Sequence, residues 1–243
     1  MDRGRHAVAR SRGIDVAAGW PARDPHGRGA GHASSEPQTR RAPKMTWPVD
    51  VWLRRWCRNG SNRVFGVDMI EIRPATPDDA TGVARAHVRS WQVGYRGLIA
   101  QEYLDALRPE DRAQRYGFDR MPLRGPYTQV AVDGDAICGH VTTGLSRDDD
   151  LRGQGEIWAI YVDPVRWGTG IGQRLLTAGC EQLRGQGVAI AGLWVLDGNV
   201  RARRFYESAR WRWHGTRRTD TIGDDVVDEV RYQRTLRPTD GRP

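Results

Sequence analysis

The spacing of apolar residues predicts alternating strands and helices from residue 69 onward. Residues 69–75 alternate polar and apolar positions, as a strand with one buried face does. Thr76 and Pro77 then provide an N-cap and a first helical turn. The apolar positions that follow are three and four residues apart, as in an amphipathic helix: Ala80, Val83, Ala84, His87, Val88 and Trp91.

The rest of the pattern predicts an α/β chain with one mixed, mostly antiparallel sheet and helices on both faces. Two short helical stretches are expected first, a hairpin with a turn at Asp133-Gly134 comes next, and a largely apolar strand follows it. The expected ranges in chain order are helices at 100–107 and 109–121, the hairpin over 127–145, a strand at 156–162, a helix ending near Leu183, a strand at 189–196, a helix at 199–209, and strands at 210–218 and 226–236.

Residues 1–68 have a different composition, rich in Arg, Gly, Ala and Pro without a sustained period. They hold 13 Lys and Arg against 6 Asp and Glu, whereas the remainder holds 25 against 24. Such a segment buries too little apolar surface to fold, so we expect disorder here and in residues 239–243. Met69 precedes the first strand, which suits a start site chosen too far upstream. A nucleic-acid-binding arm and an organelle transit peptide are the alternatives.

Residue counts weigh against several classes of protein. A single lysine beside 37 arginines indicates GC-rich coding rather than selection for phosphate contacts, so a nucleic-acid partner is not expected. Cys57, Cys138 and Cys180 are far apart, which fits neither a disulfide framework nor a metal site and favours a cytoplasmic setting. No apolar run reaches the roughly 20 residues of a membrane span, so no membrane partner is expected.

Three glycines stand at alternate positions between the strand at 156–162 and the next helix: Gly168, Gly170 and Gly172. Glycine permits positive φ and close approach of a ligand, and the first N–H groups of a helix bind anions. The spacing matches neither a dinucleotide-binding nor a Walker loop. The loop therefore predicts a phosphate or pyrophosphate site, with a purely structural tight turn as the alternative.

Four separated motifs together resemble the GNAT family of N-acetyltransferases over about residues 69–237. They are IRPATPDDATGVARAHVRSWQVGYRGLIAQEYLDAL, YVDPVRWGTGIGQRLL, LWVLDGNVRARRFYESARW and DEVRYQRTL, in the family's order. The resemblance implies a single N-acetyltransferase domain over 69–238 with acetyl-CoA as co-substrate. It also implies a V-shaped gap between the strands at 156–162 and 189–196, through which the thioester enters.

The resemblance assigns cofactor contacts along this gap. The pyrophosphate is expected on the backbone of Gly168, Thr169, Gly170, Ile171 and Gly172, and pantetheine beside Ile160, Tyr161 and Val162. Trp167 stands where the family usually has Arg or Gln, and the adjacent Arg166 is the expected substitute. Asn199 is expected to contact pantetheine or cap its helix, and Arg203 to touch the 3′-phosphate or lie on an exposed face. Arg210 replaces a glycine that normally adopts a left-handed C-cap.

The resemblance also implies direct acetyl transfer to an amine in a ternary complex. Tyr206 matches the family's general acid, with packing beside Phe205 as the alternative. Glu156 matches a base found in histone-type members, with an Arg pair as the alternative, and the Val162 N–H is expected to stabilise the oxyanion. Trp91 and Tyr95 are candidate acceptor contacts or core residues. The acceptor is expected to be a small molecule or peptide and the protein a monomer or homodimer, and a non-catalytic acyl-CoA sensor is the alternative function.

Overall fold

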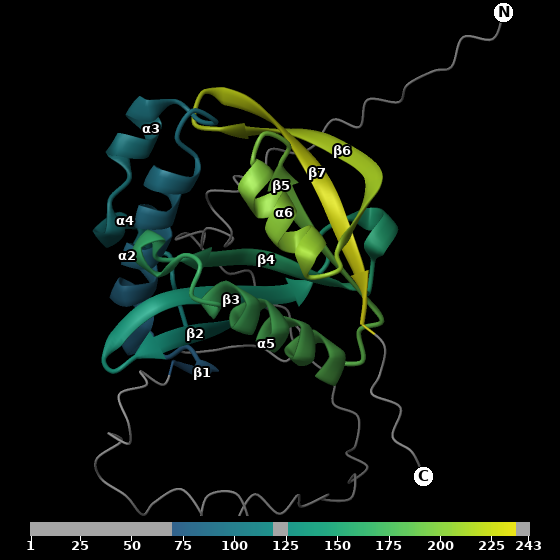
Figure 1. The fold of residues 1–243 in the computed structure, drawn as a ribbon, viewed down its shortest axis with the longest axis horizontal. Helices are drawn as coiled ribbons and strands as arrows, with labels where there is room; N and C mark the ends of the chain where they lie inside the picture. Colours follow the sequence, from purple (N-terminus) through teal and green to yellow (C-terminus); the bar gives the residue numbers. More distant parts are fainter. Residues whose placement is uncertain (1–69, 119–125, 237–243) are drawn as a thin grey trace, which may run out of the picture. The chain divides into compact units, whose positions relative to one another are not determined.

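One seven-stranded mixed sheet organises the chain, with the strands in the order β1-β2-β3-β4-β5-β7-β6 (Figure 1). The computed structural model describes residues 70–118 and 126–236, so the expectations for 1–68 and 239–243 lie outside the described residues. The strands are β1 (Glu71–Pro74), β2 (Tyr127–Asp133), β3 (Ala136–Leu145), β4 (Gly155–Val162), β5 (Ile190–Leu196), β6 (Arg212–Ile222) and β7 (Asp225–Thr235). Every neighbouring pair is antiparallel except β4 and β5, which confirms the predicted fold class.

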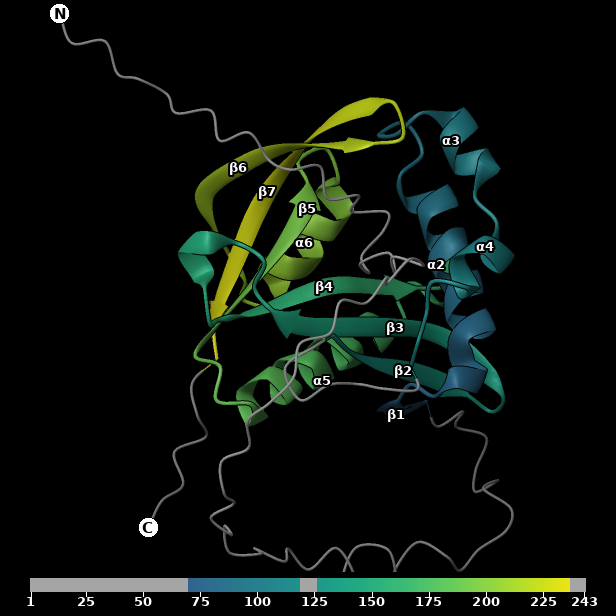
Figure 2. The same ribbon diagram turned by 180° about the vertical axis from the view of Figure 1, so that it is seen from behind.

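Helices cover both faces of this sheet (Figures 1 and 2). They are α2 (Ala80–Gly94), α3 (Gln101–Ala106), α4 (Pro109–Ala113), α5 (Ile171–Gly185) and α6 (Val200–Ser208). The main core lies between the sheet and α5, where Leu175, Leu176 and Leu183 are fully buried. The apolar stripe of α2 packs on β3 and β4, as its spacing predicts.

Short 3-10 turns complete the chain path. They are η2 (Pro77–Asp79), η3 (Asp149–Leu151) and η4 (Pro164–Arg166). Asp79 in η2 accepts the backbone N–H of Thr76 and pairs with Arg73 at 2.7 Å, which joins β1 to the start of α2. Asp163 accepts the backbone N–H of Val165 at 3.1 Å and so caps η4 directly after β4.

Two element boundaries differ from the sequence prediction. Helix α4 ends at Ala113 rather than continuing to 121, because Tyr116 and Phe118 instead turn into the core beside α2. Strand β6 extends four residues beyond the predicted end, to Ile222, as it pairs with β7 along the sheet edge. The left-handed conformation expected at Arg210 is confirmed, with φ of 63°.

Candidate active site

The candidate site opens where β4 and β5 part. These parallel strands pair only at Gly155 with Ala191 and at Glu156 with Gly192. Two residues further on, β4 has a bulge. Thr143 of β3 pairs with Ile157 and Thr142 pairs with Ala159, so Trp158 between them has no partner on β3. Such a bulge bends a strand. The bend leaves a cavity of about 360 Å³ between the two strands.

The backbone of β4 turns its polar groups toward this gap. Asp163 donates its N–H to Cys138 O at 2.8 Å, so the next pair, Val162 with Gly139, is a non-hydrogen-bonded pair of the antiparallel ladder. The N–H and C=O of Val162 therefore face away from β3 and into the gap, and those of Ile160 do the same. The Trp167 indole already donates to Val162 O at 2.8 Å.

The glycine loop lies at one end of the cavity. Gly168 and Gly170 have φ of 80° and 85°, in the region that L side chains avoid, and Gly170 is the N-cap of the 15-residue α5. Gly172 is different, since a Cβ there would lie 3.4 Å from the Phe205 ring, an ordinary contact. The loop thus presents the N-terminus of a long helix, whose dipole and N–H groups favour an anion.

Two arginines assigned to phosphate contacts are engaged elsewhere. Arg166 lines the cavity but forms an ion pair with Asp133. Arg203 is outside the cavity lining and binds Asp197 and the Tyr232 hydroxyl. Among the described residues that line the cavity, Arg201 is the arginine that no carboxylate binds, and sequence reasoning missed it.

Arg201 lines the cavity without an ionic partner. No carboxylate of the described residues lies within 4.0 Å of its guanidinium, which stacks over Trp167 with its central carbon 3.3 Å from the ring centroid. The sequence could have indicated Arg201. It lies four residues before Phe205 on α6, so the two side chains share the face of the helix that lines the cavity.

Tyr206 reaches the same cavity from α6. Its side chain is 92% buried, and its hydroxyl has no hydrogen-bond partner among the described residues. Burial raises the pKa of this phenol well above its usual value, with a smaller contribution from Tyr161, so the group keeps its proton at neutral pH. Asn199 also lines the cavity and accepts the Ala202 N–H at 3.0 Å, so it does cap α6.

The structure does not bring Glu156 into the cavity. Its carboxylate is 2% exposed and accepts the Arg147 backbone N–H at 3.0 Å and the Arg147 guanidinium. The alternative of a pair with an arginine describes this position, although the carboxylate itself is buried. Thr169 and Ile171 are also absent from the lining, and Ile171 packs in the main core.

The other end of the cavity holds aromatic side chains and one carboxylate. Trp91 and Tyr95 line it, while Trp91 also belongs to a buried cluster with Leu104. Trp91 is therefore a core residue that also lines the cavity. Glu229 lines this end too, and sequence reasoning missed it because its partners lie on other strands.

The comparisons with known proteins identify the family. A family model described as the acetyltransferase (GNAT) family matches residues 87–210, about half of the chain. The chain belongs to this family, whose members are N-acetyltransferases with acetyl-CoA as co-substrate. The glycine loop at the start of α5, the gap-facing backbone of β4 and the unpaired Arg201 fit such a nucleotide thioester.

Individual relatives agree with this assignment. The chain is 28% identical over 131 residues to the uncharacterized N-acetyltransferase YuaI of Bacillus subtilis, covering 54% of this chain and 74% of that protein. It is 37% identical over 150 residues to a mycothiol acetyltransferase of Saccharopolyspora erythraea, covering 60% of this chain but 45% of that enzyme.

Solved structures show the same fold. The acetyltransferase yncA of Salmonella typhimurium, solved with acetyl-CoA, gives a TM-score of 0.55 at 17% identity, covering 72% of this chain and 98% of that one. Across residues 70–118 and 126–236, no helix is both long and apolar enough to span a membrane.

Proposed function

We propose that the protein transfers the acetyl group of acetyl-CoA directly to a primary amine of a small molecule or peptide, with both substrates in the cleft. The observation that supports this most is the unpartnered hydroxyl of buried Tyr206, which opens into the same cavity as the gap-facing backbone of Val162. A proton donor and an oxyanion donor therefore face one space, as acyl transfer requires.

The residues of this chain suit the two parts of acetyl-CoA. The loop N–H groups at Gly168 and Gly170, with the Arg201 guanidinium, suit its phosphates. The gap-facing N–H and C=O of Ile160 suit the amides of pantetheine, which pairs as an extra strand would. When bound, acetyl-CoA supplies the thioester.

The proposed chemistry assigns one role to each group. The neutral amine nitrogen attacks the carbonyl carbon, the new C–N bond forms and the C–S bond breaks. The Val162 N–H donates to the carbonyl oxygen as negative charge develops there. Tyr206 gives its proton to the departing sulfur. The nitrogen loses one proton, which returns to Tyr206 through solvent. Glu156 has no step here, because Arg147 occupies its carboxylate.

The test is a comparison of Tyr206→Phe with the unaltered protein. We expect turnover, followed as CoA thiol release with an amine present, to fall at least about 100-fold. The dissociation constant for acetyl-CoA should stay within about twofold, because the hydroxyl is assigned to the leaving sulfur rather than to binding. Tyr127→Phe removes a hydroxyl from β2, outside the cavity lining, and should change neither quantity.

Two results would contradict the proposal. Full turnover in Tyr206→Phe would remove the acid role. Tight acetyl-CoA binding without thiol release from any amine would instead indicate an acyl-CoA sensor.

A further inference from the structure

The part of the cavity lining that we assign to the acceptor is mostly aromatic or aliphatic and holds a single acid: Trp91, Tyr95, Tyr161, Trp194, Ile222 and Glu229. Ser90, beside Trp91, adds one hydroxyl. Within the described residues Glu229 is the only acidic side chain that lines the cavity at all. The arginines of the lining are Arg166, which Asp133 binds, and Arg201, which stacks on the Trp167 ring.

Glu229 is buried and has a single hydrogen-bond donor among the described side chains. It lies on β7 between Leu196 of β5 and Arg218 of β6, and is 3% exposed. Its only hydrogen-bond donor among the described residues is Arg218, whose Nε lies 2.7 Å from Oε2. Burial raises the pKa of Glu229, and Arg218 lowers it by a smaller amount.

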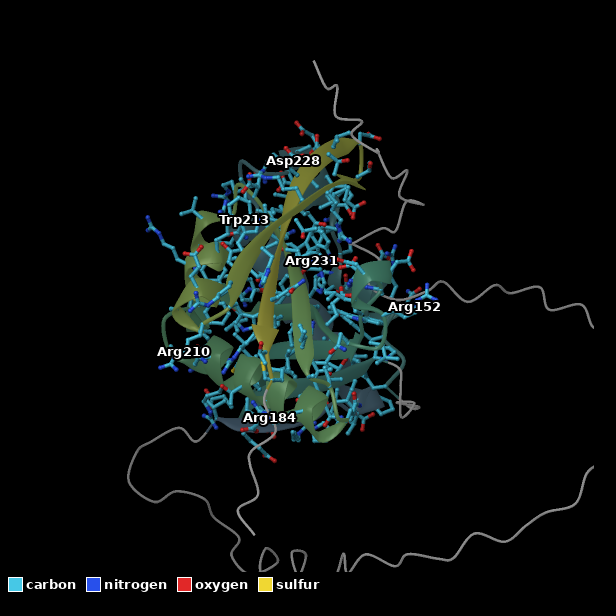
Figure 3. All side chains as sticks on the ribbon, turned by 90° about the vertical axis from the view of Figure 1, so that its right-hand side faces the viewer. Arg152, Arg184, Arg210, Trp213, Asp228 and Arg231 are labelled. Atoms are coloured by element: carbon cyan, nitrogen blue, oxygen red, sulfur yellow. The ribbon has the colours of Figure 1, made fainter. Side chains whose placement is uncertain are left out.

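Arg218 is shared between two acids, Glu229 and Asp148. Asp148 Oδ1 lies 3.9 Å from the Arg218 guanidinium, and Asp148 also binds Arg231 at 3.0 Å, which in turn binds Asp150. Arg231 lies inside the outline of the molecule in Figure 3, unlike Arg152 and Arg210 at its edge. This group of side chains joins three acids to two arginines, and Glu229 is the member that reaches the cavity.

Among the described residues, the arginines near Glu229 are all bound by acids. Arg218 and Arg231 belong to the same group of charges as Glu229, and Arg147 is bound by Glu156. An acceptor carboxylate placed beside Glu229 would therefore lose its hydration next to a second carboxylate and gain no free guanidinium there, which is strongly unfavourable. An ammonium group, by contrast, meets a carboxylate and aromatic faces, both of which attract cations.

We infer that Glu229 binds the ammonium group of the acceptor, and that the acceptor is a monoamine with an aromatic or aliphatic body and no carboxylate. This rests on the proposed acetyl transfer. The apolar body packs against Trp91, Tyr95 and Ile222, while the nitrogen lies between Glu229 and Tyr206. The ammonium group releases one proton to solvent before the neutral nitrogen attacks the thioester.

The first test compares acceptors that differ by one group, with the full-length chain. We expect kcat/KM for 2-phenylethylamine and for phenylalanine amide to exceed that for phenylalanine at least about tenfold, because only phenylalanine brings a carboxylate into the cavity. Equal or faster acetylation of phenylalanine would overturn the inference while leaving acetyl transfer intact. Failure of acetyl-CoA to bind, measured separately by calorimetry, would instead count against the proposed function.

The second test removes the charge. Glu229→Gln should raise KM for 2-phenylethylamine about 10- to 100-fold, the usual effect of losing a charged hydrogen bond. The dissociation constant for acetyl-CoA should not change, and Glu229→Asp should recover part of the lost affinity. Asp228→Asn makes the same charge change at the neighbouring, exposed position of β7 and should leave KM unaltered.

Melting temperatures separate this effect from a folding defect. If Glu229→Gln does not fold, Glu229→Asp still tests the assignment, because the shorter side chain displaces the carboxylate and should raise KM. An unchanged KM in folded Glu229→Asp would then overturn the inference. An equal rise in KM in Asp228→Asn, or an unchanged KM in folded Glu229→Gln, would overturn the assignment of Glu229.

Discussion

The guanidinium of Arg201 lies flat over the indole of Trp167, 3.3 Å from its centroid, at the mouth of the glycine loop. The same indole donates to Val162 O, so one side chain joins β4, the loop and α6. Trp167 stands where the family resemblance leads one to expect Arg or Gln. The structure provides a cation at this place from α6 instead of from the loop itself.

Arg201→Gln should weaken acetyl-CoA binding about tenfold, because a charge-assisted contact to phosphate is lost. The weakening should shrink as salt concentration rises, since exposed charges are screened. Arg204→Gln removes the same charge from an exposed position on α6 outside the cavity lining. A similar loss of affinity in both variants, measured by titration calorimetry, would mean that only the general charge of α6 matters.

Gly170→Ala should destabilise the protein by about 1 kcal/mol, because φ of 85° is strained for a residue with a Cβ. It should also weaken acetyl-CoA binding, since relief of that strain displaces the first N–H groups of α5. Gly172→Ala is the matched control, as its Cβ would make only ordinary contact with Phe205. Urea unfolding and calorimetry measure both effects, and equal effects at the two glycines would contradict the assignment.

Arg210→Gly should stabilise the protein by about 1 kcal/mol, because Arg210 is the only non-glycine residue with positive φ in the described part of the chain. Arg210→Ala keeps a Cβ in the same conformation and should gain little. The measurement is the midpoint of urea unfolding for the three proteins. A gain in Arg210→Ala equal to that in Arg210→Gly would show that the side chain, and not the backbone, is responsible.

Stability should fall as the pH drops below about 6.5, the ordinary pKa of histidine. His140 is 1% exposed, both of its ring nitrogens lack partners, and burial lowers its pKa to about 3, with Arg112 contributing less. His87, Tyr116 and Tyr161 face it, and burial also lowers the pKa of His87 well below its usual value.

The sign follows from proton counts. Between pH 6.5 and about 3 the unfolded chain binds a proton at His140 that the folded protein refuses, so unfolding is favoured by about 1.4 kcal/mol per pH unit and per site. His140→Leu should reduce this slope in pH-dependent urea unfolding. His214→Leu replaces an exposed histidine of β6 and serves as the control substitution. An unchanged slope in His140→Leu would contradict the account.

Local patterns were enough to predict the elements that form the site. The 3.6-residue period placed the buried face of α2, and alternate glycines correctly marked a loop that needs positive φ at Gly168 and Gly170. The separation of β4 and β5 was predicted only through the family resemblance. A single sequence does not show it, because it depends on where two strands distant in the chain stop pairing.

Side-chain partners explain where the site prediction and the structure differ. Arg203 has the charge of a phosphate ligand, but Asp197 and Tyr232 hold it. Glu156 has the chemistry of a base, but Arg147 occupies it. Glu229 could not be singled out, because its relation to the cavity follows from the register of β7 against β5 and β6.

The central claim is that the cleft between β4 and β5 holds acetyl-CoA on the α5 N-terminus. The most direct measurement is a calorimetric titration of acetyl-CoA into the full-length protein. The account predicts binding at one site per chain with a dissociation constant in the micromolar range. No detectable binding at millimolar acetyl-CoA would contradict this claim. It would also contradict the role of Tyr206 as the acid and that of Arg201 as a phosphate contact.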